Sequence, residues 1–276
     1  MRTADLDTIN TATVRQIASG EEGAIPFYGF VDVDFLKCPA FVMFTNADCS
    51  VVNEILTHGE FEPGSLRLWL ELCRTATCAF DIGSYTGIFA LAAASARPDL
   101  PVHAFEPNPF TCARMRINKC ANAAWNITDY HLALGAETEL RKLRWRMKGG
   151  RGLPSNATLG IIDLDRKEQE TSIVQVSPLL EALVPTGFGS HPVMKIDVEG
   201  AEALVFEGLR AILPQLPDII LETFDAGACA YISALLEPYG YRYAIVHEAT
   251  GALEPCAQLR PSDPAGRDRN HFLTAH

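Results

Sequence analysis

Short apolar runs alternate with helical stretches along the chain from about residue 77 onward. The apolar runs cover 78–82, 102–105, 127–134, 193–198 and 218–223. Between them, apolar residues recur at helical spacing in 88–97, 109–120, 201–212 and 228–236. Strands without an alternating pattern are typical of a parallel sheet that is buried on both faces. The pattern therefore predicts an α/β fold, with a mostly parallel sheet and helices on both faces.

The segments outside this alternation of apolar runs and helical stretches predict secondary structure less clearly. Residues 41–44 are typical of a short strand, and Ser65 is in position to cap a helix through 66–72. Glycines and prolines interrupt 136–190, which we expect to be irregular. Near the end of the chain, apolar residues at 241–247 and 272–273 predict a closing antiparallel pair.

These signals predict two parts of the chain. Residues 1–62 are expected to form an N-terminal extension that packs on the main domain or forms a lid over it. Residues 63–276 are expected to form the main domain.

Composition and charge narrow the class of protein. Of the 276 residues, 48% are hydrophobic and 21% are charged, which is typical of a globular chain with a real core. The net charge of −11 disfavours nucleic acid as a partner, because an acidic surface repels the phosphate backbone. The basic stretch Arg141–Arg151 is short, and we interpret it as a solvated loop.

The cysteines and apolar runs give expectations about the compartment. No pair among the eight cysteines has Cys-x-x-Cys spacing, so no structural zinc site is indicated. Residues 1–16 lack the apolar core of a signal peptide, and no apolar run is long enough to cross a bilayer. We expect reduced thiols, a cytoplasmic location and no insertion into a membrane. No feature indicates an oligomeric state.

Several predicted strands end in an acidic residue. These strand-end acids are Asp81, Glu106, Asp197 and Glu222. The carboxyl ends of parallel strands meet at one edge of a sheet, where α/β proteins bind their ligands. We therefore expect these side chains to line one crevice.

The first of these strand ends is the turn Asp81-Ile82-Gly83-Ser84-Tyr85-Thr86-Gly87. Glycines let a backbone turn sharply and approach a ligand closely, although a plain tight turn is the structural alternative. The spacing is not the Gly-x-Gly-x-x-Gly of dinucleotide binders, and no Gly-Lys-Ser/Thr follows it.

At the next strand end, Glu106 is suited to accept hydrogen bonds from both hydroxyls of a ribose, or to cap the following helix. Asn108, followed by a proline, is typical of a helix N-cap. The glycine turn and Glu106 together predict a nucleoside ligand without a 2′-phosphate.

Three acids crowd the turn Asp197-Val198-Glu199-Gly200-Ala201-Glu202. We expect Asp197 in the central crevice, facing a sulfonium or ammonium cation, a substrate hydroxyl or a divalent metal. Glu199 and Glu202 also suit the first turn of a helix, where acids interact favourably with the helix dipole. Glu222 either joins Asp197 around the substrate or a metal, or is a hydrogen-bonded acid at a strand end.

These motifs resemble those of the FkbM-type methyltransferase family. The resemblance is carried by residues 80–87, 104–109 and 194–202, of which the last stretch is the most specific. Residues 59–63 and Asn270 also fit the family pattern. The resemblance implies a class I methyltransferase fold with a Rossmann-like, seven-stranded sheet and an S-adenosylmethionine cofactor. It also implies O-methylation of a hydroxyl on a sugar or a secondary metabolite.

The resemblance further implies roles for single residues. The residues expected to contact the cofactor are Glu62, Asp81, Gly83, Ser84, Tyr85, Gly87, Glu106, Asn108 and Asp197. Asp197 is expected beside the transferred methyl group, and we hypothesise that it acts as the base for the acceptor, assisted by Glu199 or Glu222. The family commonly has Ala-Asn where this chain has Ser84-Tyr85. A divalent metal is compatible with these acids, but no ligand pattern indicates one.

Three alternative functions stay open at this point. The nearest is an N-methyltransferase of the same fold. An NAD-dependent oxidoreductase would carry a Gly-x-Gly-x-x-Gly turn, which the sequence lacks. A non-catalytic binding module is the third, and Tyr85 is the only feature in its favour. Whichever holds, we expect a small-molecule or glycan acceptor whose pocket is shaped by residues 1–60 and 137–190.

Overall fold

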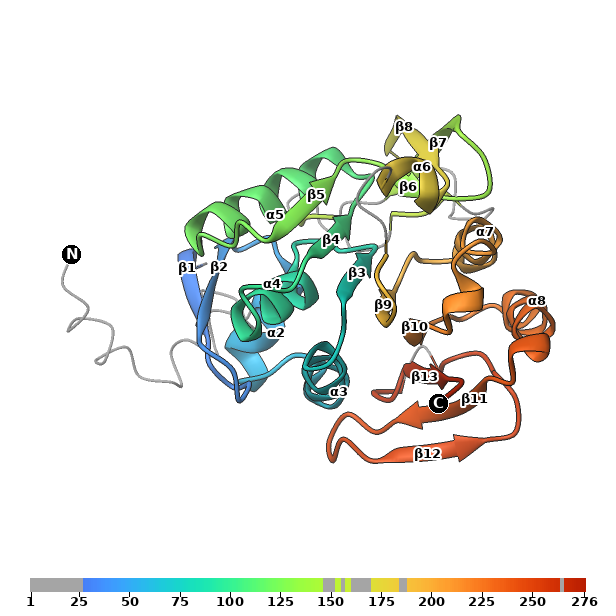
Figure 1. Cartoon of the computed structure of the whole chain (residues 1–276). Helices are drawn as coiled ribbons and strands as arrows, with labels where there is room; N and C mark the ends of the chain where they lie inside the picture. The colour runs from blue at the N-terminus through green and yellow to red at the C-terminus, as the bar shows by residue number, and fades with distance from the viewer. Residues whose placement is uncertain (1–26, 146–151, 155–156, 160–169, 184–187, 264–265) are drawn as a thin grey trace.

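The computed structural model describes residues 27–145, 152–154, 157–159, 170–183, 188–263 and 266–276. Within these ranges the chain forms one large sheet flanked by helices, a smaller three-stranded sheet and a two-stranded hairpin (Figure 1). Among the helices of these ranges, none combines the length and the apolar character that crossing a membrane would require.

The large sheet is the framework of the site. Its strands are β3 (Cys78–Ile82), β4 (Val102–Phe105), β5 (Ile127–Tyr130), β9 (Pro192–Ile196), β10 (Asp218–Glu222), β11 (Arg242–Val246), β12 (Leu253–Cys256) and β13 (Asn270–Thr274). Their order is β12-β11-β13-β10-β9-β3-β4-β5, and the strands from β10 to β5 run parallel. The predicted α/β fold with a mostly parallel sheet is confirmed. In the described residues β12 adds an eighth strand at one edge.

Helices cover both faces of this sheet. On one side lie α3 (Pro63–Cys73), α4 (Ile88–Ala96) and α5 (Pro109–Ala121), and on the other lie α7 (Glu202–Gly208) and α8 (Ala226–Leu236) (Figure 1). The short 3₁₀ helices η3 (Leu213–Gln215) and η4 (Glu237–Tyr239) follow α7 and α8.

Capping residues set where two of these helices begin. Asn108 is the N-cap of α5, as predicted, and its side chain accepts a hydrogen bond from the Phe110 amide. The prediction that Ser65 caps a helix is wrong. Helix α3 begins at Pro63, with Glu62 at the N-cap, because proline suits the first helical position.

The described part of the N-terminal segment shares the core of the sheet. It contains β1 (Tyr28–Val33), β2 (Phe41–Asn46) and α2 (Ser50–His58), and the expected strand at 41–44 is confirmed within β2. Met43 and Val52 belong to the same buried cluster as residues of α3 and α4. Asn118 in α5 and Asn122 at its C-cap hydrogen-bond to the backbone of β2. Residues 27–62 therefore pack directly on the main domain.

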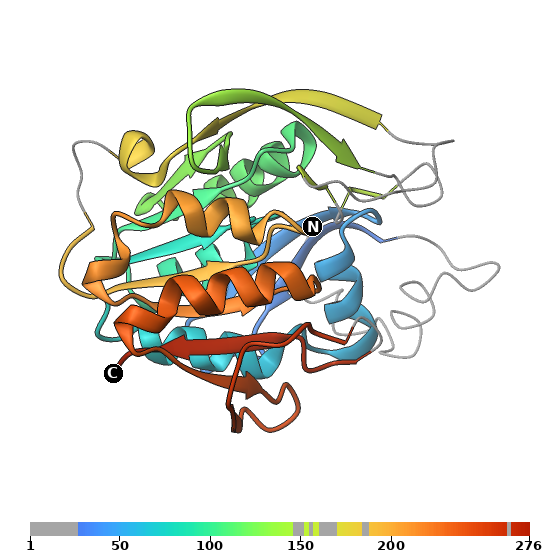
Figure 2. The same cartoon turned by 90° about the vertical axis from the view of Figure 1, so that its right-hand side faces the viewer.

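The expectation of an irregular segment over 136–190 is wrong for much of its length. The described part contains β7 (Glu139–Trp145), β8 (Glu170–Ser177) and α6 (Leu179–Leu183), and β8 pairs with β7 and with β6 (Ala133–Leu134). Leu143 and Trp145 are buried, so the first half of the basic stretch is a half-buried strand and not a solvated loop. Residues 146–151 of that stretch lie outside the described residues. The predicted strand 127–134 divides between β5 and β6, which belong to different sheets. Figure 2 shows the small sheet beyond one edge of the large one.

Side-chain alternation in the central strands places polar groups on one face. The apolar residues that face α3 and α4 from β3, β9 and β10 are Ala79, Val193 and Ile220. Two residues further along each strand stand Asp81, Lys195 and Glu222, all of them buried. Because alternate residues of a strand share a face, these three side chains lie on the α3–α4 side, at the carboxyl end of the sheet.

Candidate active site

A cavity of about 380 Å³ opens at this edge of the sheet. Its walls come from the turn after β3, the ends of β4, β9 and β10, residues 50–62, and the region of the small sheet. The predicted site residues that line it are Glu62, Asp81, Gly83, Ser84, Tyr85, Glu106, Asp197, Glu199 and Glu222. Gly87 and Asn108 do not line it, so their positions affect the cavity only through neighbouring residues.

Gly83 is the point where the turn after β3 meets the end of β9. Its φ of +83° lies in the left-handed region, and its amide donates a hydrogen bond to the Phe105 carbonyl. A Cβ at this position would lie 1.8 Å from the carbonyl oxygen of Asp197. Only glycine therefore allows the two backbones to approach so closely.

Two other residues of the turn, Asp81 and Gly87, hold it against α4 and α5. The Asp81 carboxylate accepts a hydrogen bond from the Ala90 amide in α4, at 2.9 Å. Gly87 is the N-cap of α4, with a φ of +92°, and a Cβ there would lie 2.9 Å from Met115. Burial raises the pKa of Asp81 to about 7, although the Ala90 amide opposes the shift.

Tyr85, the departure from the family pattern, also has a left-handed backbone. Its φ is +51°, a conformation that asparagine adopts more readily than tyrosine. Its amide donates to the Glu106 carboxylate at 2.8 Å. Its ring lines the cavity, and the hydroxyl lies 3.4 Å from the Ser50 amide and 3.5 Å from the Leu153 carbonyl. Tyr85 therefore links the β3 turn to two other walls of the cavity.

Glu106 presents a preorganised carboxylate. One oxygen accepts the Tyr85 amide and the other accepts the Asn108 amide, at 2.8 and 2.7 Å. Burial raises the pKa of Glu106 to about 7, against these two hydrogen bonds, which lower it. Because a carboxylate offers about four lone-pair sites, Glu106 keeps acceptor capacity for a ligand beyond these two amides.

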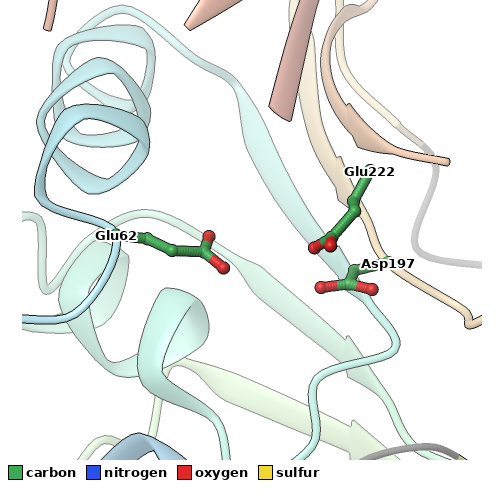
Figure 3. Close-up of side chains that lie close together, drawn as sticks. All are labelled: Glu62, Asp197 and Glu222. Carbon is green, nitrogen blue, oxygen red and sulfur yellow. The ribbon is translucent and has the colours of Figure 1, made fainter. Parts of the chain in front are cut away.

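The second half of the site is a group of three carboxylates (Figure 3). Asp197 follows β9, Glu222 ends β10, and Glu62 reaches toward both from the start of α3. One carboxylate oxygen of each lies within 4.8 Å of the others. Burial, together with the charge of Asp197, raises the pKa of Glu62 and of Glu222. We call Glu62, Asp197 and Glu222 the acid triad.

Lys195 provides a buried positive charge beside the acid triad. Its ammonium lies 3.3 Å from the Asp197 carboxylate, and only 2% of its side chain is exposed. Burial lowers the pKa of Lys195, but the charges of Asp197, Glu62 and Glu222 outweigh it and hold the pKa above its usual value. Lys195 therefore stays charged and neutralises part of the triad.

Asn270 and Glu248 hold Glu62 in its place. Glu62 has a φ of +37°, and its carboxylate accepts a hydrogen bond from the Asn270 amide group at 2.9 Å. Glu248 accepts hydrogen bonds from the amides of Gly64 and Ser65 and from the Ser65 hydroxyl, and so caps α3.

The structure groups the acids differently from the sequence-based hypothesis. Glu222 lies with Asp197, as expected, but Glu199 lines the cavity outside the acid triad. Burial and the charges of Asp197 and Glu202 raise the pKa of Glu199. Glu62, which was expected at the cofactor, lines the cavity and also lies with Asp197 and Glu222.

Sequence reasoning also missed Lys195, Glu248 and the contact of Asn270. A lysine inside an apolar strand was a usable signal for Lys195, because such a charge is buried only with partners. Glu248 and Asn270 gave no comparable signal, since both act through contacts with a segment nearly two hundred residues away.

Comparisons with known proteins agree with this geometry. Residues 81–243 match the family described as the methyltransferase FkbM domain, which is more than half of the chain. A curated relative is the 31-O-demethyl-FK506 methyltransferase FkbM of Streptomyces tacrolimicus. It is 29% identical over 203 residues, which cover 64% of this chain and 76% of the relative.

Solved structures with a similar chain path include two methyltransferases. An S-adenosylmethionine-dependent methyltransferase from Agrobacterium tumefaciens has a TM-score of 0.46 at 11% identity, covering 92% of this chain and 71% of that one. An O-methyltransferase from Thermotoga maritima has a TM-score of 0.44 at 9% identity, covering 85% of this chain and 73% of that one. Scores below 0.5 at such identities say nothing about substrate or mechanism.

Proposed function

Because the chain belongs to the FkbM methyltransferase family and is an S-adenosylmethionine-dependent methyltransferase, we propose that it methylates a hydroxyl group of a sugar or a secondary metabolite. The observation that carries the proposal is the Asp197 carboxylate, which is 30% exposed in the cavity and paired with Lys195. A hydroxyl is a poor nucleophile until it loses its proton, whereas a neutral amine can attack without a base. A paired carboxylate at this place therefore favours an oxygen acceptor.

The residues present fit the cofactor. Gly83 lets the β3 turn lie directly against the end of β9 beside the cavity, and the remaining acceptor capacity of Glu106 suits the hydroxyls of a ribose. We assign Asp81, Gly83, Ser84 and Tyr85 to the methionine part. Gly87 and Asn108 would act by holding α4 and α5, whose first turns flank the site.

When bound, the cofactor supplies an electrophilic methyl group on a sulfonium. The chain then has to orient the acceptor and remove the proton of its hydroxyl as the new C–O bond forms. We assign the proton to a carboxylate oxygen of Asp197, which the Lys195 ammonium holds in place from 3.3 Å. Glu222 adjoins Asp197, and Glu199 lines the same cavity, so both are in place to hold the acceptor.

Calorimetry and kinetics test this function. We expect the full chain to bind S-adenosylhomocysteine and not NAD, and to transfer labelled methyl groups to hydroxyl compounds more readily than to matched amines. Asp197→Asn should lower kcat at least a hundredfold and leave S-adenosylhomocysteine affinity within a few-fold, in the range of general-base catalysis. Unchanged turnover of Asp197→Asn with normal S-adenosylhomocysteine affinity would refute the role of Asp197. Methylation confined to amines would show that the acceptor atom is nitrogen and not oxygen.

The walls of the cavity support the proposed place of the acceptor. Val51 and Phe61 come from the N-terminal segment, and Leu143 and Leu159 come from the region between β6 and β9. We propose that residues 1–60 and 137–190 shape the acceptor pocket around a small molecule or glycan. A net charge of −11 disfavours nucleic acid, and eight free cysteines within the described residues suit a reducing cytoplasm.

A further inference from the structure

The acid triad has the arrangement of a cation site. Its carboxylates come from three separate elements and converge on one point from different directions (Figure 3). Two oxygens on opposite sides of Mg²⁺, each at about 2.1 Å, are about 4.2 Å apart. The triad oxygens lie within 4.8 Å of one another, and oxygens bound to one Mg²⁺ are about 3–4.2 Å apart, so a single cation placed between the three carboxylates can reach all of them after side-chain adjustment.

The second observation is the side-chain amide of Asn270, whose buried oxygen has no hydrogen-bond partner among the described residues. Asn270 pairs with Glu222 across β13 and β10, so their side chains lie on the same face of the sheet. Its amide nitrogen donates to Glu62, which aims the side chain at the triad. Its amide oxygen is fully buried and has no hydrogen-bond partner among the described residues. Reversing the amide would only exchange the orphaned atom, so this group still requires a partner.

The net charge of the acid triad and Lys195 is also compatible with a divalent cation. Lys195 neutralises one of the three carboxylates, and a charge of two remains when all are ionised. Lys195 approaches one oxygen of Asp197, which leaves the other oxygen for a metal. A divalent cation would bring the group to neutrality, which matters because buried charges are costly unless they are compensated.

We propose that Glu62, Asp197, Glu222 and Asn270 form a binding site for a divalent metal of the Mg²⁺ or Mn²⁺ type. All four offer oxygen ligands, which hard cations prefer, and the described residues place no cysteine or histidine in the group. The metal would lie at the acceptor end of the cavity and lower the pKa of a bound hydroxyl. Its role in the reaction rests on the proposed function, but its binding does not.

Titration of Mn²⁺ into the full-length, chelator-stripped protein tests the site directly. The paramagnetic resonance signal of free Mn²⁺ should fall with saturation at one ion per chain, and Mg²⁺ should compete. Glu222→Gln should weaken Mn²⁺ binding at least tenfold, the scale seen when a group that supports a metal is removed. Glu71→Gln is the matched control, since Glu71 is an exposed acid on α3 whose ion pair is with Arg74, and it should change binding less than twofold.

Two results would overturn the metal site. One is the absence of saturable Mn²⁺ binding to the wild-type chain, and the other is wild-type affinity in Glu222→Gln. If Glu222→Gln does not fold, Asp197→Asn serves in its place, because its side chain is partly exposed. Binding of S-adenosylhomocysteine in the presence of chelator separates the two proposals. If S-adenosylhomocysteine binds but Mn²⁺ does not, only the metal site is refuted. If Mn²⁺ binds but S-adenosylhomocysteine does not, the proposed function is refuted and the metal site is kept.

Discussion

Replacing Gly83 with alanine tests whether the close approach of two backbones builds the site. The new Cβ would lie 1.8 Å from the Asp197 carbonyl oxygen and 2.7 Å from its carbonyl carbon, where ordinary contacts begin near 3.4 Å. The turn and the end of β9 would have to separate by roughly 1.5 Å, well beyond what a packed interior absorbs without strain. That movement strains the hydrogen bond from the Asp197 amide to the Ile82 carbonyl, which is 2.9 Å long.

The magnitude follows from three contributions. An L-residue at positive φ costs about 1–2 kcal/mol, overpacking costs about 1–3 kcal/mol, and a weakened hydrogen bond costs about 1 kcal/mol. We expect Gly83→Ala to lower the free energy of unfolding by about 3–6 kcal/mol. Gly59→Ala is a matched control, because Gly59 has the same φ of +83° and nothing within 4 Å of the added Cβ. Its loss should be only about 1 kcal/mol.

Thermal and denaturant unfolding measure the difference. At roughly 2–4 °C per kcal/mol, Gly83→Ala should melt on the order of 10 °C below the wild type and Gly59→Ala about 3 °C below it. The folded fraction of Gly83→Ala should also lose S-adenosylhomocysteine affinity. Equal losses of stability in the two variants would refute the argument, since they differ only in what the Cβ meets.

Three further predictions concern single contacts. Because burial raises the pKa of Glu106 to about 7 and only its ionised form accepts both ribose hydroxyls, S-adenosylhomocysteine affinity should rise with pH through 7 and then level off. In Glu106→Gln, calorimetry should give at least tenfold weaker binding and a shallower rise, and an unchanged pH profile would contradict this assignment. Asp48→Asn should cost about 3–5 kcal/mol in denaturant unfolding, because Asp48 accepts two hydrogen bonds from the buried Arg114, whereas Asp99→Asn at an exposed pair should leave the unfolding midpoint nearly unchanged. Tyr85→Phe should change stability and cofactor affinity little, because both contacts of the hydroxyl are long, and a loss above tenfold in affinity would show a direct role.

The parts of the fold that follow from local patterns were predictable from the sequence. Fully apolar runs marked the central strands, and their parallel order placed Asp81, Glu106, Asp197 and Glu222 at one edge. The start of α5 was predictable too, because Asn108 and its following proline act locally. Each of these features depends on residues within one strand or one turn, where spacing determines geometry.

The small sheet escaped prediction because its signals conflict. Strand β7 has the sequence Glu-Leu-Arg-Lys-Leu-Arg-Trp, in which charged residues outnumber apolar ones and Leu140 is exposed. Only Leu143 and Trp145 are buried, and their partner Val174 lies about thirty residues further along the chain. Pairing with β8 therefore forms this strand, and the sequence around β7 alone does not indicate that pairing.

The acid triad depends on contacts of the same long-range kind. Glu62 reaches Asp197 and Glu222 because α3 packs over β9 and β10, and Asn270 reaches Glu62 because β13 returns antiparallel beside β10. The glycine turn, in contrast, could be read from one short motif. The glycine turn was therefore visible in the sequence, whereas the positions of Glu62 and Asn270 follow only when distant segments meet.

The residues that meet at the acid triad carry backbone strain and buried charge. Glu62 has a left-handed backbone, Lys195 is a fully buried cation, and Asn270 leaves an amide oxygen without a partner in the described residues. Each feature costs free energy in the protein alone, because backbone strain and unpaired polar groups oppose folding. A cationic ligand that meets the triad would offset the cost of the buried carboxylates and of the unpartnered amide oxygen, against repulsion from Lys195. The uncompensated oxygens at this edge of the sheet are therefore the groups that would give a bound cation its affinity.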